Sequence, residues 1–175
     1  MMPKRSKNLC ADQSGAAIIE LALVAPIFAL MTIGVVDMSN AYSRKLALEQ
    51  GAQRAVEKIM QTTQDDTVEN TLTTEAVCQV NGTTNGKCNT TPITAADVTV
   101  TFRLECTSGG TITAQTTTDP TTFDSFACTG TAKAARYIQI QVNDKYTPMF
   151  PIHFAGLTSS DGTYHLSATA GMRTQ

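Results

Sequence analysis

The chain contains no tryptophan and few aromatic residues, whereas threonine is abundant. Threonine and the β-branched apolar residues favour strands. The formal net charge is only -2, and no long basic run is present, so we expect no nucleic-acid partner. A chain of 175 residues has room for one modest domain and an anchor. This composition is typical of secreted and cell-surface β-rich proteins rather than of cytosolic enzymes.

Motifs for catalysis are lacking as well. The sequence has no G-x-S-x-G, no H-E-x-x-H and no glycine-rich phosphate loop. His153 and His165 stand apart in strand or turn contexts, and we interpret both as surface or packing residues. The aspartates do not have the spacing of a calcium loop. We therefore expect no enzyme, no metal and no cofactor.

The cysteines are distributed unevenly along the chain. Cys10 precedes a long apolar run, and the other four follow it: Cys78, Cys88, Cys106 and Cys128. No C-x-x-C pair or histidine cluster favours a zinc site, so the four predict two disulfides in an oxidising compartment. Four cysteines allow three pairings. Sequential pairing, Cys78 with Cys88 and Cys106 with Cys128, closes the two smallest loops, and we predict that pairing with Cys10 left as a thiol.

The one long apolar run, Ala16–Val36, is interrupted only by Glu20 and Thr32. As a helix it would be about 31 Å long, which matches the hydrocarbon core of a bilayer. Basic residues at positions 4, 5 and 7 precede it, and this bias predicts a cytoplasmic N-terminus with the rest of the chain outside. Pro26 lies within the run and is expected to kink or loosen the helix.

Three interpretations of this run compete. It can be a plain single-pass anchor, or a cleaved secretory signal with Ser39-Asn40-Ala41 as its small-residue cleavage site. The third interpretation also explains Gly15 and Glu20. A short basic leader, then a glycine, then a glutamate five residues later inside an apolar run resembles the leader of type IV prepilins. A carboxylate in a membrane helix is costly and usually has a partner, although Glu20 could also tolerate a position near the headgroups.

The helix is expected to continue beyond the apolar run. Ala41, Leu48, Ala52, Ala55 and Ile59 recur on one helical face, which predicts a helix to about Thr62. A second short helix is expected through Val68, Leu72 and Ala76, capped by Asp65 or Asp66. The stretches "DVTVTFRLEC", "RYIQIQVND" and "TYHLSATAGMR" alternate apolar and polar residues, and "TITAQTTT" is a weaker partner strand. They predict an antiparallel sheet with one covered face, hence an α+β head on a long N-terminal helix.

Two stretches of the chain resemble segments of one protein family. "GAAIIELALVAPIFALMTIGVVDMSNAY" resembles the leading segment of the TadE-like minor pseudopilins of tight-adherence (Tad, Flp or type IVc) pili, and "YTPMFPIHFAG" followed by "YHLSATAGMR" resembles their usual ending. The resemblance implies a pilin-like fold and cleavage by a prepilin peptidase between Gly15 and Ala16. It also implies that Glu20 pairs with the new N-terminal amine of a neighbouring subunit during assembly.

The expected organisation has four segments: a cytoplasmic leader at 1–15, a transmembrane half-helix at 16–36, a soluble half-helix at 37–62 and a periplasmic head at 63–175. By resemblance the protein acts at pilus initiation or at the pilus tip in adhesion. Its partners are then the prepilin peptidase, other minor pseudopilins, the major pilin and an inner-membrane assembly platform. The alternatives are a minor pseudopilin of a type II secretion system and a membrane-anchored binding protein outside any filament.

Overall fold

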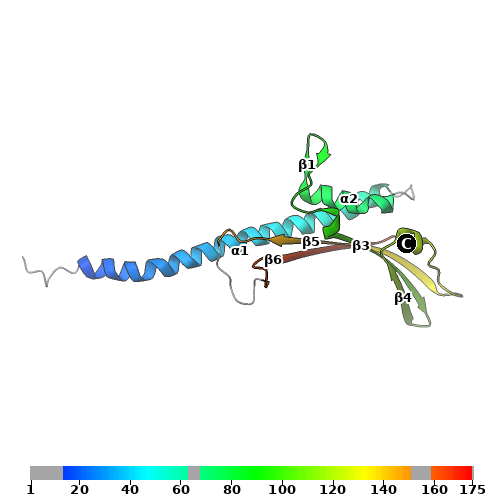
Figure 1. The fold of residues 1–175 in the computed structure, drawn as a ribbon. Helices are drawn as coiled ribbons and strands as arrows, with labels where there is room; N and C mark the ends of the chain where they lie inside the picture. Colours follow the sequence, from blue (N-terminus) through cyan, green and yellow to red (C-terminus); the bar gives the residue numbers. More distant parts are fainter. Residues whose placement is uncertain (1–13, 63–67, 151–158, 175) are drawn as a thin grey trace, which may run out of the picture.

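The computed structural model describes residues 14–62, 68–150 and 159–174. Its dominant element is α1 (Ser14–Thr62), a single helix of 49 residues that leaves the head at its N-terminal half (Figure 1). At 1.5 Å per residue, α1 is about 73 Å long. The side chains described between residues 17 and 32 are all exposed, and the first buried residue of α1 is Asp37. The predicted long helix is therefore confirmed, and it divides into a free part and a packed part.

The head contains a four-stranded antiparallel sheet in the order β4-β3-β5-β6. Its strands are β3 (Val98–Ser108), β4 (Thr111–Thr117), β5 (Lys133–Tyr146) and β6 (Tyr164–Arg173). The predicted antiparallel sheet and the α+β class are thus confirmed. Alternation explains the one-sided burial, because Phe102, Ile138 and Ile140 point to the covered face while their neighbours Arg103 and Gln139 point outward.

Two helices cover the inner face of the sheet. Helix α1 packs against β5 and β6, and α2 (Val68–Asn81) packs against α1 and β3. The predicted apolar face of α1 is confirmed where it is described, since Ala41, Leu48, Ala52 and Ala55 are buried. The side chain of Ile59 and the proposed cap residues Asp65 and Asp66 lie outside the described residues. Truncating a core side chain such as Leu48 is expected to cost about 2–5 kcal/mol.

A third helix, α3 (Pro120–Asp124), covers the end of the sheet that α1 does not reach. Asp119 caps it by accepting hydrogen bonds from the backbone N–H groups of Thr121 and Thr122. Phe123, which is buried, stacks on Phe102 with ring centroids 5.3 Å apart. The guanidinium carbon of Arg136 lies 4.7 Å from the centroid of the Phe123 ring. The sequence analysis did not predict this helix, although Asp-Pro before it is a helix-start signal.

Two small elements complete the head. A hairpin of β1 (Thr83–Thr84) and β2 (Lys87–Cys88) projects beyond α2 (Figure 1). Its turn has positive φ at Asn85 and Gly86, as a two-residue Asn-Gly hairpin turn of type I′ requires. The short 3₁₀ helix η2 (Ala95–Asp97) leads into β3. It follows Ile93, a fully buried residue that fills the core beneath α2.

Candidate functional site

The first turn of α1 contains the Gly15–Ala16 peptide bond, which is the proposed processing site. A Cβ atom added to Gly15 would meet no described atom within 4 Å. The space around this glycine is therefore open, and nothing in the fold of the described residues requires glycine there.

Glu20 lies one and a half turns further along α1, and its side chain is exposed. Its apolar neighbours are equally exposed, with 68% of Ile18 and 68% of Leu21 accessible. In the part of the chain that the structure describes, no basic group pairs with the Glu20 carboxylate. The protein thus presents a carboxylate from an apolar helix surface, and any neutralising partner must come from outside these residues.

Helix α1 remains helical through Pro26. Proline supplies no N–H group, so the carbonyl of Ala22 loses its usual intrahelical donor. The predicted kink at Pro26 stays a prediction. One turn further on, Thr32 Oγ1 donates a hydrogen bond to the carbonyl oxygen of Phe28 at 2.7 Å, so the hydroxyl of Thr32 adds no unpaired polar group to the apolar run.

An exposed apolar stripe continues along α1 past the membrane-length run. We define the α1 stripe by its seven residues: Leu30, Met31, Gly34, Val35, Met38, Ser39 and Tyr42. They recur at helical spacing, and 70% of Val35 and 62% of Tyr42 is exposed. Large apolar side chains that stay exposed in this arrangement are typical of a surface that packs on another apolar surface.

Asp37 fixes the junction between α1 and the head. It is 3% exposed, and its two carboxylate oxygens accept hydrogen bonds from the backbone N–H groups of Met149 at 2.9 Å and Phe150 at 3.2 Å. Two turns later, Arg44 forms an ion pair with Asp144 on β5, with 2.6 Å between Nε and Oδ2. Sequence reasoning missed this role of Asp37, because its partners lie more than 100 residues away.

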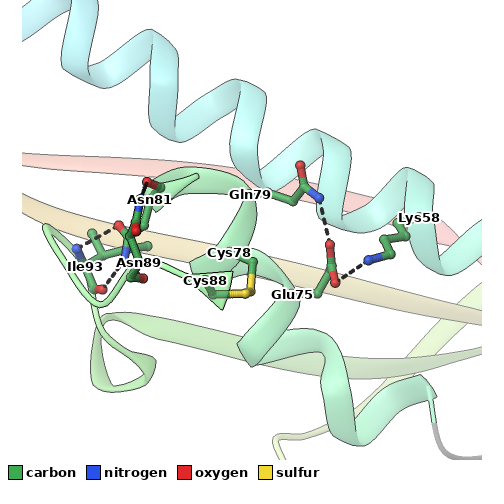
Figure 2. The surroundings of a disulfide bond; sticks show 8 residues. All are labelled: Lys58, Glu75, Cys78, Gln79, Asn81, Cys88, Asn89 and Ile93. Atoms are coloured by element: carbon green, nitrogen blue, oxygen red, sulfur yellow. Dashed lines mark hydrogen bonds and ion pairs between the residues drawn. A yellow bond between two sulfur atoms is a disulfide. The ribbon is translucent and has the colours of Figure 1, made fainter. Parts of the chain in front are cut away.

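Both predicted disulfide pairs are present in the structure. Cys78 on α2 is bonded to Cys88 on β2, and Cys106 on β3 is bonded to Cys128 after α3. Figure 2 shows the first bridge beside a hydrogen-bonded clamp, in which the side chain of Asn81 donates to the carbonyl oxygens of Asn89 and Ile93. Cys10 lies outside the described residues.

An ion pair ties α1 to α2 near the same bridge (Figure 2). Lys58 Nζ lies 2.6 Å from Glu75 Oε2, and the amide of Gln79 donates to the other oxygen at 2.7 Å. Partial burial acts to raise the pKa of Glu75, but the hydrogen bonds from Gln79 and Lys58 outweigh it and lower the pKa below its usual value. The carboxylate is therefore held in its charged form, in which it pairs with Lys58 and links α2 to α1.

His165 is the histidine that the structure describes, and its described surroundings give no catalytic arrangement. His165 on β6 is exposed, and its Nε2 lies 3.0 Å from Asp161 Oδ2. The hydrogen bond from His165, together with those from Thr163 and Lys145, lowers the pKa of Asp161. His153 lies outside the described residues. Among the residues that the structure describes, no three potential ligands gather into a metal site.

These features define a class of protein. One helix near the N-terminus is long and apolar enough to cross a membrane, and it carries an α+β head on its distal part. Within the described residues, the chain thus combines one helix of membrane-spanning length and apolarity with an α+β domain.

A family comparison adds to this description of the chain. Residues 15–57 match the family model described as TadE-like protein, which confirms the family resemblance over α1. The match begins at Gly15 and ends inside α1, so it covers the helix and not the sheet. Searches of the curated proteins and of the solved structures give no match. Over these residues the chain is similar to TadE-like proteins, and this similarity suggests an association with Tad pili.

Proposed function

We propose that this protein is a minor pseudopilin of a Tad pilus, cut by a prepilin peptidase between Gly15 and Ala16 and used at pilus initiation or at the tip. The observation that carries the proposal is the family match that starts at Gly15, with Glu20 exposed on a helix that the head leaves free. Before assembly the chain lies in the inner membrane with residues 1–15 in the cytoplasm and its head in the periplasm. Its partners are the pilin subunits and the assembly platform.

Assembly uses two surfaces of α1. The charged carboxylate of Glu20 neutralises the new amine of a neighbouring subunit, since each group alone would be costly in an apolar bundle. The α1 stripe then packs against neighbouring helices, and Gly34 within the stripe permits close approach of a second helix. The packed half of α1 keeps the head attached throughout.

The geometry disfavours a cleaved secretory signal. Ala41 is 4% exposed and lies in the packed part of α1, so cleavage after it would remove part of the helix that packs against the sheet. That cut would also remove Asp37 and the contact with Met149 and Phe150. The mature N-terminus discriminates among the candidates: Ala16 supports processing as a pseudopilin, Tyr42 a secretory signal, and an intact N-terminus a plain anchor. Sequencing it is a direct measurement.

The first prediction is that substitutions at Gly15 and at Glu20 block different steps, processing and assembly respectively. Gly15→Leu should block processing, because the peptidase must reach the backbone beside a residue without a side chain. Glu20→Ala should leave insertion intact and processing detectable but abolish pilus assembly, since it removes the charge that offsets the amine. Glu20→Gln keeps the size and tests the charge alone. Immunoblots of mature protein and microscopy of sheared pili measure the two steps.

A matched control is Glu49→Gln, which changes an exposed glutamate in the packed part of α1 and should preserve both processing and pili. If both Glu20 variants are processed and form pili normally, Glu20 is only a tolerated interfacial residue. Normal pili without this protein, together with secretion defects, would instead favour a type II secretion pseudopilin.

A further inference from the structure

The outer face of the sheet is a surface of the head that no helix of the described structure covers. The helices lie on the opposite face, with the buried residues (Figure 1). The central outward residues of β3, β5 and β6 carry hydroxyl and amide groups. They are Thr99, Thr101, Gln139, Gln141, Asn143, Ser167 and Thr169. Such side chains both donate and accept hydrogen bonds.

The net charge of this outer face is opposite in sign to the net charge of the whole chain. Among the described residues, its basic side chains are Arg103, Lys133, Lys145 and Arg173. Two carboxylates lie against them, because Glu105 pairs with Arg103 and Asp161 pairs with Lys145. The chain as a whole has a formal net charge of -2. The face is therefore a moderately basic surface on an acidic protein, which favours an anionic partner.

One depression on the face combines these properties. Three side chains form a row across the strands, because Tyr137 pairs with Arg103 on one side and with Arg173 on the other. The next row along the strands consists of Thr101, Gln139 and Gly171. Because Gly171 has no side chain, the depression is deeper at that position. The depression has a volume of about 480 Å³. Arg103 is held by Glu105 at 2.6 Å, so its guanidinium is oriented before any ligand arrives.

We propose that the outer face of the sheet binds an acidic polysaccharide, with a sugar carboxylate held between Arg103 and Arg173 and the sugar ring on Tyr137. Guanidinium groups bind carboxylates through paired charge-assisted hydrogen bonds. A tyrosine ring offers an apolar face and a polar edge, as a sugar does. The neighbouring sugars lie along β5, where Gln139, Gln141 and Asn143 contact their hydroxyl groups.

A nucleic acid fits this surface less well. Binding to a phosphate backbone needs closely spaced lysine and arginine contacts, and single strands need several aromatic platforms. The centre of the outer face is uncharged, and Tyr137 is its single aromatic residue among the described outward positions. The proposal rests on the head alone and does not depend on assembly of a pilus.

The test uses the full chain in detergent micelles and immobilised polygalacturonate, with neutral dextran and single-stranded DNA as comparison ligands. The wild type should bind polygalacturonate, bind dextran far more weakly, and lose affinity as salt is raised. Arg173→Gln and Tyr137→Ala should each weaken binding by about tenfold or more. Tyr137→Phe should retain most of it, because the ring remains.

Lys87→Gln is the matched control, because Lys87 is an exposed basic residue on β2 and lies away from the sheet. It should bind as the wild type does, and circular dichroism should show that every variant keeps its fold. Absence of binding to polygalacturonate overturns the proposal. A loss of affinity in Lys87→Gln as large as that in Arg173→Gln also overturns it. DNA binding as strong as that of the polysaccharide overturns the assignment to sugars.

Discussion

Asp37 lies where α1 passes from its free part to its packed part. Its buried carboxylate has two backbone donors, and both come from the segment after β5. Because a charged acceptor shortens and strengthens such hydrogen bonds, one side chain holds two consecutive residues of a distant segment. The sequence shows Asp37 only as a charge at the end of an apolar run, since nothing local marks a partner so far along the chain.

The second prediction concerns this residue. Asp37→Ala should remove a buried carboxylate and its hydrogen bonds with the N–H groups of Met149 and Phe150, and should lower the free energy of unfolding by about 1–3 kcal/mol. Amide hydrogen exchange at Met149 and Phe150 should become faster in the full chain. Glu49→Ala, which removes only an exposed ion pair with Lys45, should change stability by about 0.5 kcal/mol or less. Unchanged exchange at Met149 and Phe150 in Asp37→Ala would show that the carboxylate does not hold them.

At the scale of elements, helices α1 and α2 meet at a glycine. A Cβ atom on Gly51 would lie 2.4 Å from Val80 Cγ2 and 3.1 Å from the Val80 backbone. In isolation a glycine only weakens a helix, and nothing local in the sequence marks Gly51 as a packing residue. The structure shows why it is there: the missing side chain lets α2 approach α1 closely enough to bury Leu72 and Ala76.

The third prediction follows from that approach. Gly51→Ala raises the helix propensity of α1 but must displace Val80, so the net effect should be a loss of about 1–3 kcal/mol in stability. Gln53→Ala provides the control, since Gln53 is exposed on the same helix and should leave stability within about 0.5 kcal/mol. Thermal unfolding followed by circular dichroism compares the two. A Gly51→Ala variant as stable as Gln53→Ala would mean that α2 adjusts without cost.

The elements that the sequence predicts correctly are those with a clear period. The alternation of β3, β5 and β6 and the helical face of α1 are visible in the chain itself, because burial repeats every second residue or every turn. Helix α3 has only five residues, too few to show a period, and its place over Phe102 depends on the tertiary fold. The strand order β4-β3-β5-β6 also depends on which strands meet after collapse, and no single segment records it.

At the scale of the whole molecule, two disulfides close the head at opposite ends. Cys78–Cys88 spans 10 residues and fixes the small hairpin to α2, whereas Cys106–Cys128 spans 22 residues and fixes the segment after α3 to β3. Cys78 and Cys106 are equally buried, whereas their partners differ, since Cys88 is exposed and Cys128 is half-buried. The second bridge therefore closes the longer loop, which contains α3 and the Phe123 side chain that packs over Phe102 in the core.

The fourth prediction is that the two bridges contribute unequally. Replacing Cys106 and Cys128 with serine should lower stability by about 3 kcal/mol or more, because the longer loop gains more entropy on unfolding and the core loses its cover. Replacing Cys78 and Cys88 should cost less. Denaturant unfolding of the oxidised full chain in detergent measures both double variants. A larger loss from the Cys78 and Cys88 pair would contradict this ranking.

The free part of α1 has a consequence for how the head experiences its surroundings. The side chains described between residues 17 and 32 bury nothing in the head, so neither the sheet nor the two bridges depend on what surrounds them. Exchange of lipid for the apolar surface of neighbouring helices would change the solvation of that stretch and leave the packed core as it was. The chain can then move between lipid and a bundle of helices without refolding. Which of the two it occupies depends on which solvates the free part of α1, including Glu20, more favourably.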